Sequence, residues 1–251
     1  IANMHIRDLK KAWHTLGKED PLFAVLTYKD KRGGKWNEKE FFNTGKKEIK
    51  KTLEYLKNLK INLNYKKALD FGCGVGRLTQ GLADYFKEVH GVDIAPSMVE
   101  TAKKYNTKSR KCFYHLNESD DLKIFPDSSF DFVLSNITLQ HMEPRYARNY
   151  IKEFLRVLKP DGFAVFQIPE KRIAPIVEND SIKTKIKNLI PEPVVALYRR
   201  LTPNARPLIE MYGLPRDEIK KLVSENGGKI LDIKEDQSAE KWISFLYFIG
   251  K

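Results

Sequence analysis

Short apolar runs alternate with amphipathic stretches along most of the chain after Lys67. The runs predict strands, at 68–71, 89–94, 112–116, 130–135 and 163–168. The stretches between them carry apolar residues at helical spacing and predict helices, at 77–86, 96–105 and 145–158. Strands that alternate with helices are typical of βαβ units. We therefore expect an α/β fold with a mainly parallel sheet and helices on both of its faces.

The pattern differs on both sides of this region. Residues 38–60 place apolar side chains at mostly helical spacing between lysines, which predicts an amphipathic helix within an N-terminal helical cap over 1–65. Several prolines interrupt residues 171–211, and a segment of that length is typically a lid or a substrate loop, or else an elaboration that covers the sheet edge. The α/β domain is expected over 66–251, and its last elements are a helix at 216–225 and strands at 230–233 and 242–249.

Composition and cysteine content narrow the class of protein. The 251 residues suffice for one core, and no apolar run approaches the roughly 20 residues that a bilayer-spanning helix needs. The N-terminal end lacks the charged-then-apolar pattern of a secretory signal. Cys73 and Cys112 lack the spacing of a metal site or a disulfide framework. We expect a reduced, cytoplasmic protein without a metal, and the sequence leaves both a monomer and a homodimer open.

The formal net charge of +12 is unevenly distributed. Residues 1–67 contain about 17 Lys or Arg against about 8 Asp or Glu, so they supply about +9 of this excess. Such a region is either a surface for an acidic partner or a solvated, lysine-rich helix face. Lysine greatly outnumbers arginine, which is the better bidentate reader of phosphate, and this favours the solvated face.

The densest chemical signal is DFGCGVGR at residues 70–77, where an apolar strand ends in an acid and closely spaced glycines precede a helix. Glycines permit positive φ and close approach of a ligand, and the helix start offers free N–H groups. The spacing does not match the GxGxxG of dinucleotide loops, and no Lys-Ser/Thr pair follows as in nucleoside triphosphate loops. Asp70 would repel a pyrophosphate, but it suits a ligand that carries a cationic amine.

The segment ALDFGCGVGRLT resembles motif I of the class I S-adenosylmethionine-dependent methyltransferases, of the small-molecule type similar to methyltransferase domain type 11. Further motifs follow in the family's order: GVDIAPSMVETAKKY, FPDSSFDFVLSNITLQHM and RVLKPDGFAVFQIP. The resemblance covers about residues 66–170 and the closing strands. It implies a Rossmann-like, doubly wound, seven-stranded sheet with a C-terminal antiparallel hairpin, and S-adenosyl-L-methionine as the cofactor.

Carried over residue by residue, the resemblance implies a cofactor site after the first four strands. Asp70 would bind the amino group of the cofactor, directly or through water, and Asp93 would accept hydrogen bonds from both ribose hydroxyls. Asn117 or Glu118, after the third strand, would lie near the adenine amine. The other residues expected to contact the cofactor are Gly72, Cys73, Gly74, Arg77, Ile94, Met98, Ser119 and Asn136.

A candidate base lies just beyond the fourth strand, where the family often has one. A neutral imidazole at His141 could take the proton of a hydroxyl acceptor at physiological pH, or this histidine could only cap the turn before Pro144. Gln140 is a candidate for substrate contact. Glu170 and Tyr212, which flank the proline-rich segment, are further candidates that packing or capping could equally explain.

The resemblance thus implies an enzyme with a small-molecule acceptor. The first hypothesis is O-methylation of a small hydroxylated acceptor such as a sugar or sugar nucleotide, and the second is N-methylation of a small amine. RNA methylation guided by the basic N-terminal region is a third, although we find no appended RNA-binding motif and expect no nucleic acid partner. A cofactor-binding but non-catalytic protein is the last, and the intact Asp70 and Asp93 argue against it.

Overall fold

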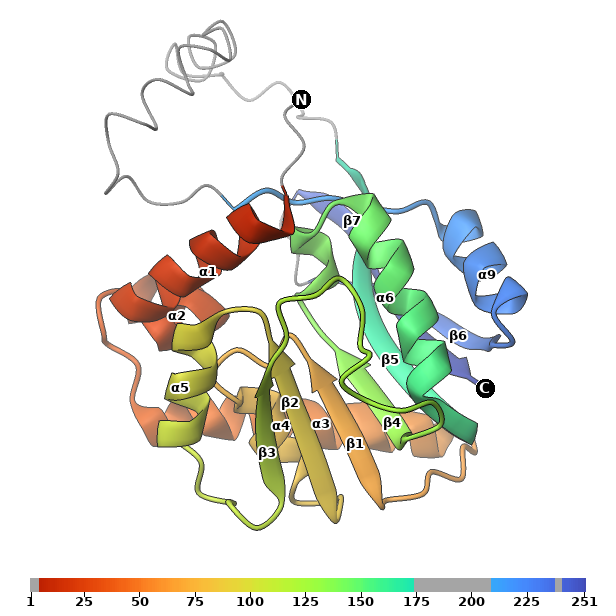
Figure 1. The fold of residues 1–251 in the computed structure, drawn as a ribbon, viewed down its shortest axis with the longest axis horizontal. Coiled ribbons are helices and arrows are strands. Elements are labelled where there is room, and N and C mark those ends of the chain that lie inside the picture. Colours follow the sequence, from red (N-terminus) through yellow and green to blue (C-terminus); the bar gives the residue numbers. More distant parts are fainter. Residues whose placement is uncertain (1–4, 174–208, 238–240) are drawn as a thin grey trace, which may run out of the picture.

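The computed structural model describes residues 5–173, 209–237 and 241–251. Their strands are β1 (Lys67–Phe71), β2 (Glu88–Asp93), β3 (Cys112–Leu116), β4 (Phe130–Ser135), β5 (Leu158–Arg172), β6 (Lys229–Asp236) and β7 (Trp242–Gly250). In the described part of the chain they form a seven-stranded sheet with the order β3-β2-β1-β4-β5-β7-β6 (Figure 1). Strands β1 to β5 are parallel, and β7 runs antiparallel between β5 and β6. The predicted fold class is confirmed.

Helices cover both faces of this sheet. They are α1 (Ile6–Glu19), α2 (Pro21–Val25), α3 (Glu38–Asn58), α4 (Arg77–Leu82), α5 (Pro96–Lys104), α6 (Pro144–Val157) and α9 (Arg216–Glu225), with single turns η1 (Lys29–Lys31) and η2 (Leu139–His141). Helices α3, α4 and α5 pack on one face, and α6 and α9 on the other (Figure 1). Burial on both faces explains why the strands are almost continuously apolar, as in the fully buried β4.

One helix is shorter than its sequence pattern predicts. Helix α4 ends at Leu82, whereas the apolar spacing continues to Phe86. The backbone N–H groups of Tyr85 and Phe86 both donate to the Leu82 carbonyl, so the chain turns there. The turn brings the Phe86 ring into the core, where it stacks on Phe132 of β4 at a centroid distance of 5.6 Å.

The N-terminal helix α3 packs against α4 without space for side chains between them. A Cβ atom added to Gly45 would lie 2.2 Å from the Arg77 carbonyl oxygen, and one added to Gly81 would lie 2.9 Å from the Ile49 side chain. The expected division into a cap (1–65) and a domain (66–251) stays a prediction. Most of the expected insertion at 171–211 lies outside the described residues.

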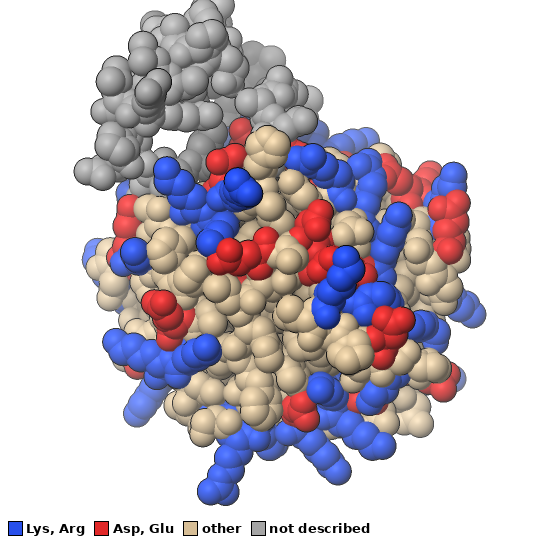
Figure 2. Space-filling model, viewed as in Figure 1, with Lys and Arg blue, Asp and Glu red and all other residues tan. Residues whose placement is uncertain are grey.

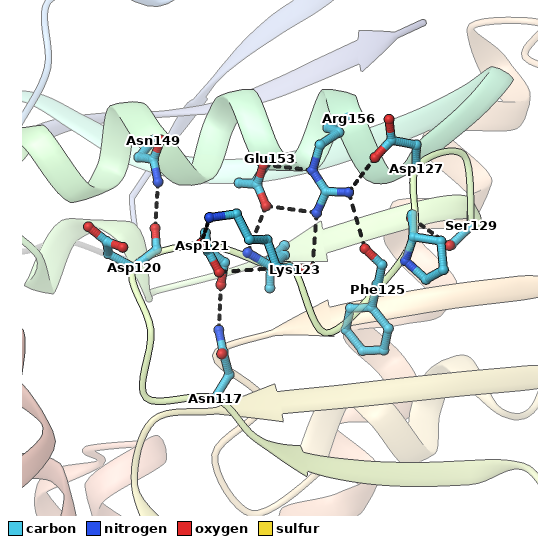
Figure 3. Close-up of polar contacts among 12 residues, drawn as sticks. Asn117, Asp120, Asp121, Lys123, Phe125, Asp127, Ser129, Asn149, Glu153 and Arg156 are labelled. Atoms are coloured by element: carbon cyan, nitrogen blue, oxygen red, sulfur yellow. Dashed lines mark hydrogen bonds and ion pairs between the residues drawn. The ribbon is translucent and has the colours of Figure 1, made fainter.

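The connection from β3 to β4 contains no helix and is held by α6 instead (Figure 3). The Arg156 guanidinium donates to the carbonyl oxygens of Leu122 and Phe125 at 3.0 and 3.1 Å, and it pairs with Glu153 and Asp127. The Glu153 carboxylate also accepts the Leu122 N–H at 2.7 Å. These bonds fix the loop over the sheet face that α6 and α9 leave open (Figure 1).

Candidate functional site

A cavity of about 910 Å³ lies at the carboxyl ends of the parallel strands. One wall is formed by the glycine loop after β1 and by the ends of β2 and β4. Helices α1, α2 and α3 of the N-terminal region supply further lining residues. Strands β1 and β4 are adjacent in the sheet, and the chain order reverses between them. Open α/β sheets bind their ligands at such a switch point.

The glycine loop forms one wall of the cavity and has no room for side chains. Gly72, Gly74 and Gly76 have φ angles of 74°, 52° and 82°, which L-residues rarely adopt. A Cβ atom at Gly72 would lie 2.2 Å from the Thr138 side chain. The N–H groups of Gly72 and Cys73 both donate to the Val92 carbonyl, so the loop is folded back onto β2. The loop backbone is therefore packed tightly between β2 and Thr138, which follows β4.

Asp70 ends up at the base of the loop, buried and lining the cavity. Its carboxylate accepts a hydrogen bond from the Thr79 hydroxyl at 2.6 Å. Burial raises the pKa of Asp70 to about 7, although the Thr79 hydrogen bond and the nearby Arg77 charge lower it. A buried acid of this kind gains from a cationic partner, since a positive charge nearby favours its ionised form.

Asp93 at the end of β2 ties the next turn together. Its two carboxylate oxygens accept the N–H groups of Gly74 at 2.9 Å and Ala95 at 2.8 Å, and burial raises its pKa. Ile94 and Met98 also line the cavity. The predicted residues Asp70, Gly72, Cys73, Gly74, Arg77, Asp93, Ile94, Met98, Asn117 and Asn136 are thus brought to one cavity.

Two predicted residues after β3 lie outside it. Glu118 forms an ion pair with Lys10 of α1 at 2.5 Å, and the carbonyl of Ser119 accepts the Tyr150 hydroxyl at 2.6 Å. Asn117 lines the cavity, and its amide donates to the Asp121 carbonyl at 2.6 Å (Figure 3). Of the two candidates for the adenine amine, the cavity contains Asn117.

A residue of the N-terminal region joins this site, and the sequence analysis did not identify it. The Glu48 carboxylate of α3 accepts hydrogen bonds from the Arg77 guanidinium at 2.7 Å and from the Asn136 amide at 2.6 Å. All three residues line the cavity. Its position in the sequence could have indicated this role, because Glu48 falls between the buried Gly45 and Ile49 on the apolar stripe of α3.

His141 lies in η2 beneath α1. Its ring meets the Trp13 ring edge-on at a centroid distance of 5.4 Å, and both residues line the cavity. The ring nitrogens lie 3.0 Å from the Gln140 amide nitrogen and 3.2 Å from the Glu210 carbonyl oxygen. This arrangement fits a neutral ring that donates from Nδ1 and accepts at Nε2. Burial lowers the pKa of His141 to about 4, so the ring is neutral at physiological pH.

The three predicted substrate residues are not brought together. Gln140 lines the cavity; its amide N–H group donates to Nε2 of His141 at 3.0 Å, and its amide oxygen accepts from Gln167 at 3.0 Å. Glu170 pairs with Arg216 at 3.2 Å, and the Tyr212 hydroxyl donates to Glu210 at 2.5 Å. Glu170 and Tyr212 are absent from the cavity lining in the described part of the chain, and their contact with a substrate stays a prediction.

The charge of the cavity is opposite to that of the whole chain. Apart from Arg77, the formally charged lining residues among those described are acids: Glu19, Asp20, Glu48, Asp70, Asp93 and Asp236. Near His141, α1, η2 and the start of α6 contribute the apolar or aromatic residues Leu9, Trp13, Met142 and Tyr146. No metal-binding group of His, Cys, Asp and Glu occurs within 5–173, 209–237 and 241–251. Within the same ranges, no helix is long and apolar enough to cross a membrane.

Residues 69–166 match the family model described as a methyltransferase domain. The chain is 32% identical over 108 residues to a malonyl-[acyl-carrier protein] O-methyltransferase of Halorhodospira halophila, covering 42% of this chain and 36% of that protein. It is 33% identical over 124 residues to a phosphoethanolamine N-methyltransferase of Triticum aestivum, covering 49% and 23%. The chain therefore spans less than half the length of these curated relatives.

Solved structures resemble the fold over the whole chain. A magnesium protoporphyrin IX methyltransferase from Synechocystis PCC 6803, solved with S-adenosylmethionine bound, superposes with a TM-score of 0.62 at 16% identity. The match covers 100% of this chain and 99% of that one. At this identity the likeness supports the fold.

Proposed function

We propose that this chain is a class I S-adenosylmethionine-dependent methyltransferase and that it methylates a small acceptor that carries a hydroxyl group; residues 69–166 match the methyltransferase domain model. We propose S-adenosyl-L-methionine as its cofactor, which is bound in a solved structure of similar fold. The curated relatives include both O- and N-methyltransferases and are matched over part of their length. The acceptor proposed here therefore depends on the cavity.

The residues around the glycine loop fit the cofactor chemically. Asp70 is a buried acid whose ionised form a cationic ammonium group would stabilise, and Gly72, Cys73 and Gly74 of the loop line the same cavity. Asp93 presents paired acceptors suited to two neighbouring hydroxyls. We propose that Asp70 holds the methionine amine, that Asp93 holds the ribose, and that Ile94, Met98 and Asn117 line the adenine pocket.

The cavity disfavours an anionic acceptor and suits one with an apolar body. Its acidic lining would repel a phosphate, so a nucleotide-linked sugar fits less well than the overall basic charge suggests. The side chains of Leu9, Trp13 and Met142, which line the same cavity as His141, offer apolar surface for a planar or hydrocarbon group. We therefore infer an acceptor that carries a hydroxyl group on an apolar or planar body. Methylation of an unsubstituted sugar would contradict this inference.

Held by Asp70 and Asp93, the cofactor would supply an electrophilic methyl group to the acceptor oxygen, and its sulfur would keep the electron pair of the broken carbon–sulfur bond. The hydroxyl proton would pass to Nε2 of His141. In the structure this nitrogen accepts a hydrogen bond from the Gln140 amide N–H group, and the acceptor hydroxyl would take the place of that donor. With a pKa of about 4, His141 is a weak base and suits an acidic hydroxyl such as a phenol.

The test begins with calorimetric titration of S-adenosylhomocysteine and of NAD, followed by a methyl-transfer screen of phenols, sugars, sugar nucleotides and amines. We expect S-adenosylhomocysteine alone to bind and a phenol to be methylated. His141→Ala should lower turnover by about 100-fold with unchanged S-adenosylhomocysteine affinity, because general bases contribute roughly that much. His5→Ala, at an exposed position of the same residue type, is the control.

Methylation of a small amine is the second candidate, and the acidic lining favours it. A neutral amine is nucleophilic without a base, so His141→Ala would then leave turnover almost unchanged. Turnover on amines but not on phenols, with that result for His141, would replace the proposal of O-methylation.

A further inference from the structure

Glu48 lies at a junction between the N-terminal region and the ligand cavity. One carboxylate oxygen accepts from Arg77, the first residue of α4, and the other accepts from Asn136, the residue that follows β4. Arg77 also lies 3.4 Å from the Thr44 hydroxyl, one turn earlier in α3. A single side chain of α3 therefore sets the orientation of two residues that come from different parts of the α/β domain.

Both partners of Glu48 keep an unused polar atom. The Nε atom of Arg77 and the Oδ1 atom of Asn136 are buried and have no hydrogen-bond partner. An unpaired buried donor or acceptor costs on the order of 1–3 kcal/mol, so such atoms in a cavity wall suggest a ligand that completes them. Arg77 needs an acceptor and Asn136 needs a donor.

The helix that carries Glu48 cannot easily shift. Gly45 packs against the backbone of Arg77, and Ile49 packs against Gly81 in α4. Glu48 lies between these two contacts along α3, and its side chain is one-third exposed. The close packing of the two helices holds the carboxylate at a defined distance from Arg77.

We propose that Glu48 is a positioning residue for the amino-acid end of the cofactor. It holds Arg77 and Asn136 so that a carboxylate can complete the first and an ammonium group the second, which is the pair of groups that a zwitterionic amino acid carries. Asp70, which lines the same cavity, adds a second acid for the ammonium group. This inference rests on the proposed function, since it needs S-adenosylmethionine as the ligand.

The adenosine half of the cofactor should be indifferent to Glu48. Asp93, Ile94 and Met98, which we assign to ribose and adenine, lie between the end of β2 and α5, and within the described part of the chain none of them is hydrogen-bonded to Glu48. Loss of Glu48 should therefore weaken ligands with an amino-acid end and spare those without one.

The experiment compares two ligands on the full chain by calorimetry: S-adenosylhomocysteine, and 5′-methylthioadenosine, which lacks the amino-acid end. In Glu48→Gln the amide can accept from one donor and presents an N–H group to the other, so one charge-assisted bond is lost. We expect the affinity for S-adenosylhomocysteine to fall about tenfold or more and that for 5′-methylthioadenosine to change by less than about twofold.

Glu54→Gln is the matched control, because Glu54 lies on the same helix, is 60% exposed and pairs only loosely with Lys50 at 3.8 Å. It should change neither affinity. An equal loss for both ligands in Glu48→Gln would overturn the proposal, because it would mean that Glu48 only supports the fold. Unchanged affinity for S-adenosylhomocysteine would overturn it as well.

The unmodified chain separates this proposal from the proposed function. If it binds neither ligand, the proposed function fails and the role of Glu48 fails with it. If it binds both but Glu48→Gln shows no selectivity, only the role of Glu48 fails. A double variant tests whether Glu48 acts through Arg77. If it does, Glu48→Gln should lower the affinity for S-adenosylhomocysteine less in the Arg77→Met protein than in the unmodified chain. Fully additive effects of the two substitutions would contradict an action through Arg77.

Discussion

The carboxyl edge of the sheet ends in acids that line the cavity, such as Asp70 and Asp93, whereas the amino edge is preceded by exposed cations. These cations are Lys66 before β1, Lys87 before β2, and Arg110 and Lys111 before β3. Figure 2 shows Lys and Arg side chains projecting along the lower border of this face, below the amino ends of β1 to β3 in Figure 1. The two edges of one sheet thus carry charges of opposite sign.

This difference teaches that the net charge of the chain is a poor guide to the ligand. A strand of five residues such as β1 spans about 16 Å, which is longer than the screening distance of about 8 Å at physiological ionic strength. Cations at the amino edge therefore have little influence on a ligand at the carboxyl edge. The acids in the cavity decide which ligand charge is accepted there.

The largest expected effect concerns Asp93 at the carboxyl edge. Asp93→Ala should weaken S-adenosylhomocysteine by about 100-fold, because it removes a charged acceptor for the ribose and also releases the N–H groups of Gly74 and Ala95. Calorimetry measures the change, with Asp217→Ala at a 94% exposed position as the control. Unchanged affinity would remove the ribose assignment.

Two glycines, one at each edge of the sheet, allow a direct comparison of how tightly the backbone is packed there. Gly72 in the cavity wall and Gly227 just before β6 have φ angles of 74° and 78°, but a Cβ atom would clash with Thr138 only at Gly72 and meets nothing within 4 Å at Gly227. Alanine at either position destabilises the fold, because an L-residue is strained in the left-handed backbone conformation. At Gly72 the clash with Thr138 adds about 2 kcal/mol to this loss of stability. Denaturant unfolding should show that difference between Gly72→Ala and Gly227→Ala, and equal losses would contradict the close packing of the loop.

The raised pKa of Asp70 predicts pH-dependent cofactor binding. With a pKa of about 7, Asp70 is mostly protonated at pH 6 and mostly ionised at pH 8, so the affinity for S-adenosylhomocysteine should rise about tenfold over this interval. For the protein without cofactor, the effect of rising pH on the free energy of unfolding has the opposite sign. Since the folded pKa exceeds the unfolded one, the contribution of Asp70 to stability is present below about pH 4 and is lost as pH rises through 7. Asp70→Asn should flatten both profiles; a persistent pH dependence of binding would point to another group.

The smallest effect is expected at the amino edge. Replacing Lys66, Lys87, Arg110 and Lys111 together by glutamine should change turnover and S-adenosylhomocysteine affinity by less than about twofold, because these charges are screened from the cavity. RNA binding measured against salt concentration is the companion test. A steep, salt-dependent RNA affinity that this variant loses, together with lost turnover, would instead indicate an RNA substrate bound at the amino edge of the sheet.

Local patterns predicted most of the fold. The apolar runs identified β1 to β5 because buried parallel strands are apolar on both faces, and Asp70 and Asp93, near the ends of two such runs, were predicted from the glycine-loop pattern and the family resemblance. Neither inference needs contacts between distant residues. The end of α4 was wrong by a few residues, because the periodicity of Tyr85 and Phe86 continues past the point where the backbone turns.

The loop after β3 shows where such reasoning stops. Asn117 and Glu118 are consecutive and were alternatives for a contact with the adenine amine, and of these two only Asn117 lines the cavity. Arg156 of α6 anchors the loop, and Lys10 of α1 draws Glu118 away. The choice depends on side chains that lie far away in the sequence.

The sequence by itself determined the sheet, the glycine loop and the acids at the strand ends, since all of these follow from residues that are neighbours along the chain. Only the tertiary structure brought Trp13 and Glu48 of the N-terminal helices to the cavity and placed His141 beneath α1. It also separated the basic edge from the acidic one. The physical reason is that packing and electrostatics act through space, over distances that a linear pattern of residues does not record.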